Sequence, residues 1–111
     1  MAATLIVIWW RDIPAQVIAK DRRQSHKIVL HARFQVAIDR AAVKADLKQF
    51  DRYIEQWRRV ARPCGDDLRA EAEAEATRLE AEYPKEALNA LVLSGGARAP
   101  EPAGRAEGAA G

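Results

Sequence analysis

The feature that most constrains this chain is an apolar run over residues 5–10, Leu-Ile-Val-Ile-Trp-Trp, which stops at Arg11. β-Branched and aromatic residues are dense here and the run is too short for a free-standing helix, so a buried strand is predicted over residues 3–10. Pro14 then favours a turn or a strand edge, because it lacks a backbone donor. Residues 17–20 are expected to return as a second strand. A hairpin alone is rarely stable, so helices must cover one face.

The segment from residue 30 to 45 has the apolar spacing of a helix, with Ser25 as its expected N-cap. Its apolar residues recur at steps of three and four, namely Leu30, Phe34, Ala37, Ile38, Ala41 and Ala45. A neighbouring stripe of valines lies seven residues apart, at Val29, Val36 and Val43. So wide an apolar arc predicts the central helix of the fold.

Further helical segments are expected in the second half of the chain. Residues 50–61 carry apolar side chains on one helical face before an Arg-Pro-Cys-Gly break. The Asp66–Asp67 pair favours the start of a third helix over residues 68–83, whose apolar face is mostly alanine. Pro84 divides this helix from a last piece over residues 85–93.

These segments predict one small α+β domain over residues 1–93, with an N-terminal β hairpin packed against two or three amphipathic helices. Two main helices cover the hairpin in this prediction, and the acidic segment 66–93 attaches more loosely. An essentially all-helical bundle with one terminal strand is the alternative. From residue 94 to residue 111 Gly, Ala, Pro and Glu predominate without periodicity, so a disordered tail is expected.

Charge is unevenly distributed along the chain. Residues 1–65 hold 13 Lys or Arg against 6 acids, whereas residues 66–86 hold 3 against 8. We expect the acidic segment to lie against the basic part of the same molecule; the alternative is a charged partner. The apolar run is far shorter than the roughly 20 residues of a membrane span. One cysteine cannot form an intrachain disulfide, so a cytoplasmic location is expected.

The block around the first turn is the least generic part of the sequence. Adjacent tryptophans on a strand point to opposite faces, so one is expected in the core and the other near the surface beside Arg11. An exposed tryptophan with arginine is typical of an interface hot spot, and the alternative is a tryptophan covered by a later helix. The predicted partner-binding residues are Trp9, Trp10, Arg11, Asp12 and Gln16.

A basic cluster follows, comprising Lys20, Arg22, Arg23 and Lys27. Such a cluster is either a solvated face or a nucleic-acid-binding patch, although the chain carries no motif of a nucleic-acid-binding family.

No catalytic constellation is visible in the sequence, so a non-enzymatic protein without a metal or cofactor is expected. His26 and His31 are five residues apart, a poor spacing for one helical face, and Cys64 has no partner of metal-site type nearby. The Gly95–Gly96 pair does not follow a strand, so it predicts no phosphate loop. A reactive thiol at Cys64 is a further alternative.

Three stretches carry a resemblance to a known family. They are Ile-Trp-Trp-Arg-Asp-Ile-Pro-Ala-Gln-Val at 8–17, Arg-Phe-Gln-Val-Ala-Ile-Asp-Arg-Ala-Ala at 33–42 and Tyr-Ile-Glu-Gln-Trp-Arg at 53–58. Over residues 3–62 the chain resembles the small bacterial family labelled "virulence factor", and the acidic helix lies outside the resemblance.

The family has no assigned catalytic residues to carry over, and a similar domain accompanies helical repeats in proteins of the conserved virulence factor C type. The resemblance thus implies a binding or scaffolding module. Stand-alone members tend to be encoded near folate- and corrinoid-dependent methyl-transfer proteins. The expected function is therefore an accessory protein whose partner is a protein such as a methyl-transfer enzyme, with nucleic acid as the alternative partner.

Overall fold

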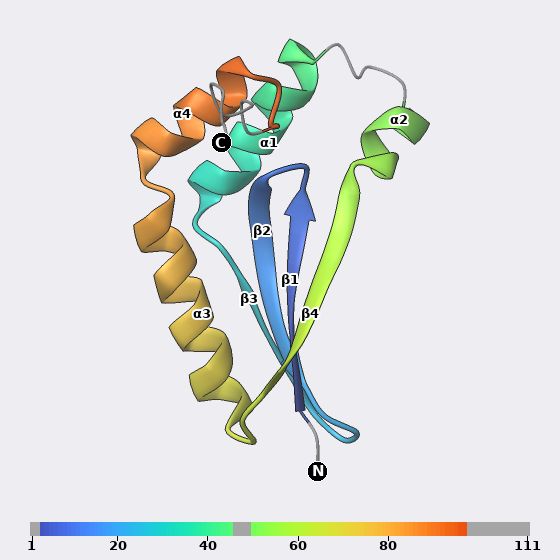
Figure 1. The fold of residues 1–111 in the computed structure, drawn as a ribbon, viewed down its shortest axis with the longest axis vertical. Helices are drawn as coiled ribbons and strands as arrows, with labels where there is room; N and C mark the ends of the chain where they lie inside the picture. Colours follow the sequence, from blue (N-terminus) through green and yellow to red (C-terminus); the bar gives the residue numbers. More distant parts are fainter. Residues whose placement is uncertain (1–2, 46–49, 98–111) are drawn as a thin grey trace, which may run out of the picture.

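The computed structural model describes residues 3–45 and 50–97 and shows an α+β fold. The elements follow in the order β1 (Ala3–Trp10), β2 (Ile13–Lys20), β3 (Ser25–Val29), α1 (Ala32–Lys44), α2 (Phe50–Glu55), β4 (Trp57–Cys64), α3 (Leu68–Glu82) and α4 (Lys85–Leu93). The strands form one antiparallel sheet in the order β3-β2-β1-β4 (Figure 1). The predicted fold class is confirmed, and the all-helical alternative is wrong.

The predicted hairpin is present as β1 and β2. Leu5 pairs with Ala19 and Val7 with Val17, and all four side chains are buried in the core. The second strand starts earlier than expected and includes Pro14, which lies beside a shift in register. A register irregularity interrupts the regular ladder, and this is where a strand tolerates a residue without an N–H donor.

The expectation of a helix capped by Ser25 is wrong at its start. Ser25 opens β3, in which His26 and Ile28 are half-buried while Lys27 and Val29 are exposed, the two-residue period of a strand. α1 begins after His31, whose side chain accepts a hydrogen bond from Arg33 N at 3.1 Å.

The helix expected over residues 50–61 is also wrong in its second half. α2 ends at Glu55, and the chain continues as β4 along the whole length of β1. Between Arg58 and Pro63 the side chains of β4 are exposed, so its apolar spacing does not mark a buried helical face. The strand forms because β1 offers a free edge to which eight residues can hydrogen-bond.

α3 is the main helical cover of the sheet, which corrects the expectation of a loosely attached helix. It packs across β2, β3 and β1 on one face of the sheet (Figure 1). Asp67 caps it as predicted, accepting a hydrogen bond from Ala70 N at 3.1 Å. Its alanine face suits this position, because Ala72 and Ala76 are buried and let the helix approach closely.

α4 follows Pro84 as predicted and lies beside α1 at the end of the sheet that carries the β1–β2 turn (Figure 1). The chain then turns back, and Gly95 and Gly96 are buried. Residues 94–97 were expected in a disordered tail but pack on the fold, because a glycine fits closely against Trp10. The rest of the expected tail, residues 98–111, lies outside the described residues.

The valine stripe does not join the core, which corrects the prediction that a wide apolar arc including these valines makes α1 the central helix. Val36 is 53% exposed and Val43 is 72% exposed, while Val29 lies on β3. The buried face of α1 is instead formed by Phe34, Ala37, Ile38, Ala41 and Ala42. None of the helices in the described part of the chain has the length and apolarity that a membrane span requires.

Candidate functional site

The β1–β2 turn, predicted as a partner-binding site, is tied into the molecule from two directions. Arg11 has a φ of +52°, and its side chain donates to Gln56 Oε1 at 2.9 Å and to Gly95 O at 3.0 Å. Its backbone N–H donates to Gln56 O at 3.1 Å, and that of Asp12 donates to Gly96 O at 2.9 Å. These bonds hold the turn against the end of α2 and against the segment that follows α4.

The two tryptophans divide between core and surface as predicted, but Arg11 stacks on the buried Trp10, 5.5 Å from its ring centroid, and not on the tryptophan near the surface. Trp10 is fully buried, and its indole N–H donates to Tyr53 O at 3.0 Å. Trp9 is half-buried, packs edge-to-face on Tyr83 with ring centroids 6.2 Å apart, and has the Arg58 guanidinium 5.2 Å from its ring centroid. Only Trp9 of the pair has surface to offer a partner.

The two remaining predicted residues lie on different sides of this region. Asp12 Oδ1 accepts a hydrogen bond from Arg58 at 3.3 Å beside the turn. Gln16 lies in β2 opposite Val29, and its Oε1 is buried without a hydrogen-bond partner in the described structure. The five residues therefore do not share one open surface. Partner binding by this cluster stays a prediction, and Trp10 and Arg11 are occupied by contacts within the chain.

The basic cluster surrounds the β2–β3 turn and is exposed at all four positions, Lys20, Arg22, Arg23 and Lys27. The turn itself is held by Asp21, whose Oδ1 accepts from Arg23 N and Gln24 N at 2.8 Å each. These backbone hydrogen bonds lower the pKa of Asp21. The cluster therefore lies on the surface of the β2–β3 hairpin.

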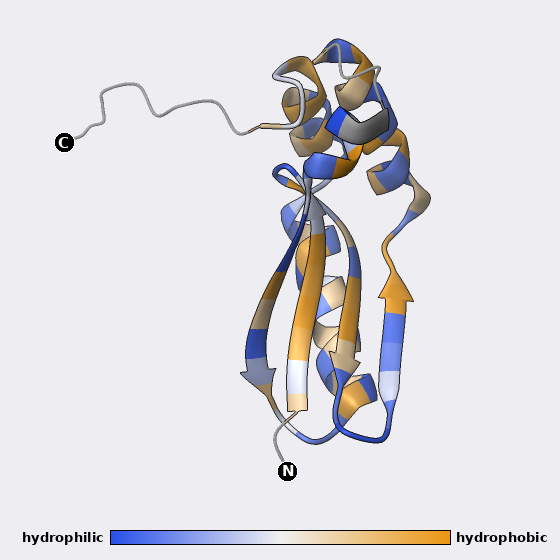
Figure 2. Cartoon of the chain, turned by 90° about the vertical axis from the view of Figure 1, so that its right-hand side faces the viewer, coloured by the Kyte–Doolittle hydropathy of each residue, from blue (hydrophilic) through white to orange (hydrophobic). Residues whose placement is uncertain are grey.

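The sheet face opposite α3 continues this basic region. Cross-strand pairs place Ile6 and Ile18 at its centre, with Ile8 beside Arg59 and Ile18 beside Lys27. No described helix packs along this face, which Figure 2 views with α3 behind the strands. The residues that the four strands present here include Lys20, Lys27 and Arg59 and no acid.

The acidic helix lies against the basic part of the chain, as expected. Glu75 is only 7% exposed, and both of its carboxylate oxygens accept hydrogen bonds from Arg78, at 3.1 and 2.6 Å. Arg62 of β4 reaches the same carboxylate at 3.4 Å. The Arg78 guanidinium is the main reason why the pKa of Glu75 is lowered. Glu75 therefore stays charged at neutral pH and joins α3 to the sheet.

The surroundings of Cys64 favour its protonated thiol. Desolvation, followed by the nearby Glu71 carboxylate, raises the pKa of its thiol. A raised pKa keeps the thiol protonated near pH 7, whereas a nucleophilic cysteine needs the opposite shift. Within residues 3–45 and 50–97, no three His, Cys, Asp or Glu side chains form a group that could hold a metal ion.

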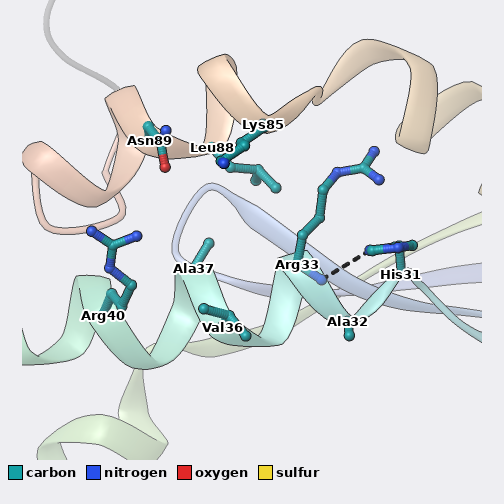
Figure 3. A pocket seen from close by; sticks show the side chains of 9 residues that line it. All are labelled: His31, Ala32, Arg33, Val36, Ala37, Arg40, Lys85, Leu88 and Asn89. Atoms are coloured by element: carbon teal, nitrogen blue, oxygen red, sulfur yellow. Dashed lines mark hydrogen bonds between the residues drawn. The ribbon is translucent and has the colours of Figure 1, made fainter.

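A different surface is hollowed, between α1 and α4. One hollow of about 380 Å³ is lined by residues of both helices, including Ala37, Leu88 and Asn89 (Figure 3). A second, shallower hollow of about 500 Å³ continues toward Val43 and Leu93, and Arg40 lines both. We call the two hollows together the α1–α4 groove.

The α1–α4 groove combines an apolar floor with a basic rim. Leu88 and Val92 are buried at its base. The rim carries the cations Arg33, Arg40, Lys44 and Lys85, and Figure 3 shows Arg40 and Arg33 extending from α1 toward α4. Asp39 is the acid among the residues that line it, and its Oδ1 accepts from Gln35 Nε2 at 3.0 Å.

Arg33 sets the position of α4 beside α1. Its guanidinium donates to Glu80 O at 2.8 Å and to Tyr83 O at 3.2 and 3.3 Å, and lies 4.8 Å from the Phe34 ring centroid. These bonds satisfy carbonyls at the end of α3, just before Pro84 turns the chain into α4. Arg33 therefore shapes one end of the α1–α4 groove.

A family model described as "Virulence factor" matches residues 8–92. The chain belongs to this family. The match extends beyond residue 62 and includes α3, so the acidic helix is part of the virulence factor domain and not an addition to it. Comparisons with curated proteins and with solved structures find no match.

The groove of this virulence factor domain was not predicted from the sequence. The residues that could have indicated the groove are Val36 and Val43, which lie on one helical stripe with Arg40 on the outer side of α1. A valine stripe at helical spacing is the usual mark of a core face, and only the position of α4 shows that these valines are left outside. Leu93 was likewise included in the last helix without any reason to expect it at a surface.

Proposed function

We propose that this chain is a non-enzymatic protein-interaction module that binds its partner at the α1–α4 groove. The observation that carries the proposal is the exposure of Val36, Val43 and Leu93, at 53%, 72% and 71%. They are half of the six large hydrophobic residues that are exposed in the described structure, and all three line this groove. Apolar side chains gathered in one hollow surface are typical of a binding site.

The module is proposed to act as an accessory protein in the cytoplasm. The link to folate- and corrinoid-dependent one-carbon metabolism rests on the family resemblance alone, and a methyl-transfer enzyme is the partner it suggests. The protonated state that its environment favours for Cys64 supports a role without thiol chemistry.

Site-specific photo-crosslinking in the native host tests the proposal. A benzophenone amino acid replaces Val36 or Val43, and the control places it at Thr77, which is exposed on α3 away from the groove. We expect a protein adduct from the groove positions and not from the control. Equal adducts at all three positions, or none at the groove, would contradict the proposal. Mass spectrometry of the adduct tests the metabolic link separately, because a partner unrelated to methyl transfer removes that link alone.

Nucleic-acid binding on the open sheet face is the second candidate. It is favoured by Lys20, Lys27 and Arg59, which lie on one uncovered face without an acid. Cations of this kind bind phosphates with an affinity that falls steeply as salt increases. Fluorescence anisotropy with labelled single-stranded RNA and DNA at low and physiological salt tests it, with the Lys20→Glu/Lys27→Glu variant as control. Absence of binding at low salt would remove this candidate.

A further inference from the structure

We infer that the occupant of the α1–α4 groove is an acidic amphipathic helix of a partner protein. The inference rests on the proposed function and adds the chemistry and shape of the partner. Four features lead to it: the length of the groove, the direction of its two helices, its uncompensated positive charge and the burial of the apolar face of this chain's own acidic helix.

The groove is long and open, like the surfaces that receive a helix. On α1 its lining residues Ala32, Val36, Arg40 and Val43 are spaced by four, four and three, so they follow one helical stripe. The thirteen residues of α1 correspond to a length of about 20 Å at 1.5 Å per residue, and the nine residues of α4 to about 14 Å. The stretch that both walls share matches about two to three turns of a bound helix, whereas small-molecule sites are usually more enclosed.

The two walls run in the same direction. The first hollow joins Arg33 of α1 to Lys85 of α4 (Figure 3). The second joins Lys44 of α1 to Leu93 of α4. Residue numbers thus increase together along both helices, and apolar positions recur along both walls. A partner helix lying between them meets apolar residues of both hollows and not a single pocket.

The charge of the rim selects an acidic partner. Arg40, Lys44 and Lys85 make no hydrogen bond or ion pair with other described residues, so their charges are not compensated within the described fold. Asp39 offsets one of them at most. Carboxylates that flank an apolar stripe would therefore pair with free cations on both walls, which favours acidic over basic partners.

A second copy of this chain does not fit the same description. It would bring an identical set of cations to the groove. Its acidic helix α3 also buries its own apolar residues, Leu68, Ala72, Ala76 and Leu79, so α3 of a second copy cannot present an apolar stripe to the groove. The occupant is thus a different protein.

Titration of the isotopically labelled full chain with designed peptides tests the inference. The probe is a helical peptide with leucines at positions i, i+4 and i+7 flanked by glutamates. Its controls are a scrambled peptide of the same composition and a version with lysine in place of glutamate. We expect NMR shift changes confined to α1 and α4. The Arg40→Glu/Lys85→Glu variant should bind at least about tenfold more weakly, because two attractions become repulsions.

A matched charge reversal at Arg22 and Arg23, both exposed on the β2–β3 turn, should change the affinity by less than about twofold. Circular dichroism checks that both double variants keep their fold, as expected for exposed residues. Four results would overturn the inference: no shift changes, equal binding of the lysine peptide, shifts on the open sheet face, or self-association through the groove in the absence of peptide.

The interaction module and the acidic helix as its partner can be refuted independently of each other. Crosslinks at Val36 without binding of the acidic peptide would leave the interaction module standing and refute the acidic helix as its partner. Peptide binding without any crosslink in the host would refute the groove as the functional site.

Discussion

Replacing Gly96 with alanine should strongly destabilise the domain, because two costs meet at this residue. Gly96 has a φ of +90°, and a Cβ built there lies 2.7 Å from Trp10 Cζ3 and 3.3 Å from the Ala41 Cβ. The left-handed backbone costs about 1–2 kcal/mol for a residue with a side chain. Forcing a methyl group into a packed core costs about 1–3 kcal/mol more.

Trp10 has no room to move away. It is fully buried and its indole N–H is held by Tyr53 O at 3.0 Å. The two costs therefore add, and the free energy of unfolding should fall by about 2–5 kcal/mol, a large part of the total for a small domain.

Urea denaturation followed by tryptophan fluorescence measures this loss, with linear extrapolation to water. Gly65→Ala is the matched control. Gly65 has no left-handed φ, and its added Cβ meets the flexible end of Glu71 at 2.8 Å, so we expect a loss below about 1 kcal/mol. Equal losses in the two variants would refute the conclusion that the segment after α4 packs on the first turn.

Three further outcomes are expected. Arg11→Ala removes two side-chain hydrogen bonds and should lower the free energy of unfolding by about 1–3 kcal/mol in urea titrations; an unchanged midpoint would show that the turn does not need them. The pKa of Glu75 is lowered from 4.5, so its stabilising effect is present above about pH 4.5 and is lost as pH falls through the lowered pKa. The stability gap between the wild type and Glu75→Gln should therefore shrink in acid, and a gap of equal size at pH 7 and pH 3 contradicts this. Because the pKa of Cys64 is raised, iodoacetamide should alkylate it at pH 7 more slowly than a cysteine in an unstructured peptide, and faster alkylation would revive the thiol hypothesis.

The elements that were predictable from sequence carry their signals locally. The hairpin follows from one dense apolar run and a proline, and α3 follows from Asp67 at its cap. Pro84 divides α3 from α4 as expected because its ring excludes a continuous helix. None of these conclusions needs knowledge of a distant part of the chain.

The missed elements depend on distant partners. β4 is a strand because Trp57 to Cys64 complete the free edge of β1, whose paired residues lie 47 to 61 positions earlier, although the same apolar spacing also fits a helix. Likewise, Val36 and Val43 have the pattern of a core face, and their exposure follows only from where α4 lies. Periodicity states which side chains share a face but not what covers that face.

The first turn predicted here as a binding site gives the same lesson for function. Arg11 and Trp10 have the composition of an interface, and they do form one, but with residues 53, 56, 95 and 96 of the same chain. Composition indicated residues that make specific contacts, but it does not distinguish contacts within the chain from contacts with a partner.

The contacts of Arg11 also bear on how the protein is made. The β1–β2 turn leaves the ribosome well before its hydrogen-bond partners Gln56 and Gly95, which are synthesised later. Strands β1 to β3 can pair early as local hairpins, but the edge at β4 and the anchoring of the turn must wait. We therefore expect a nascent chain stalled with residues 94–97 still inside the exit tunnel to remain sensitive to proteases at its N-terminal strands.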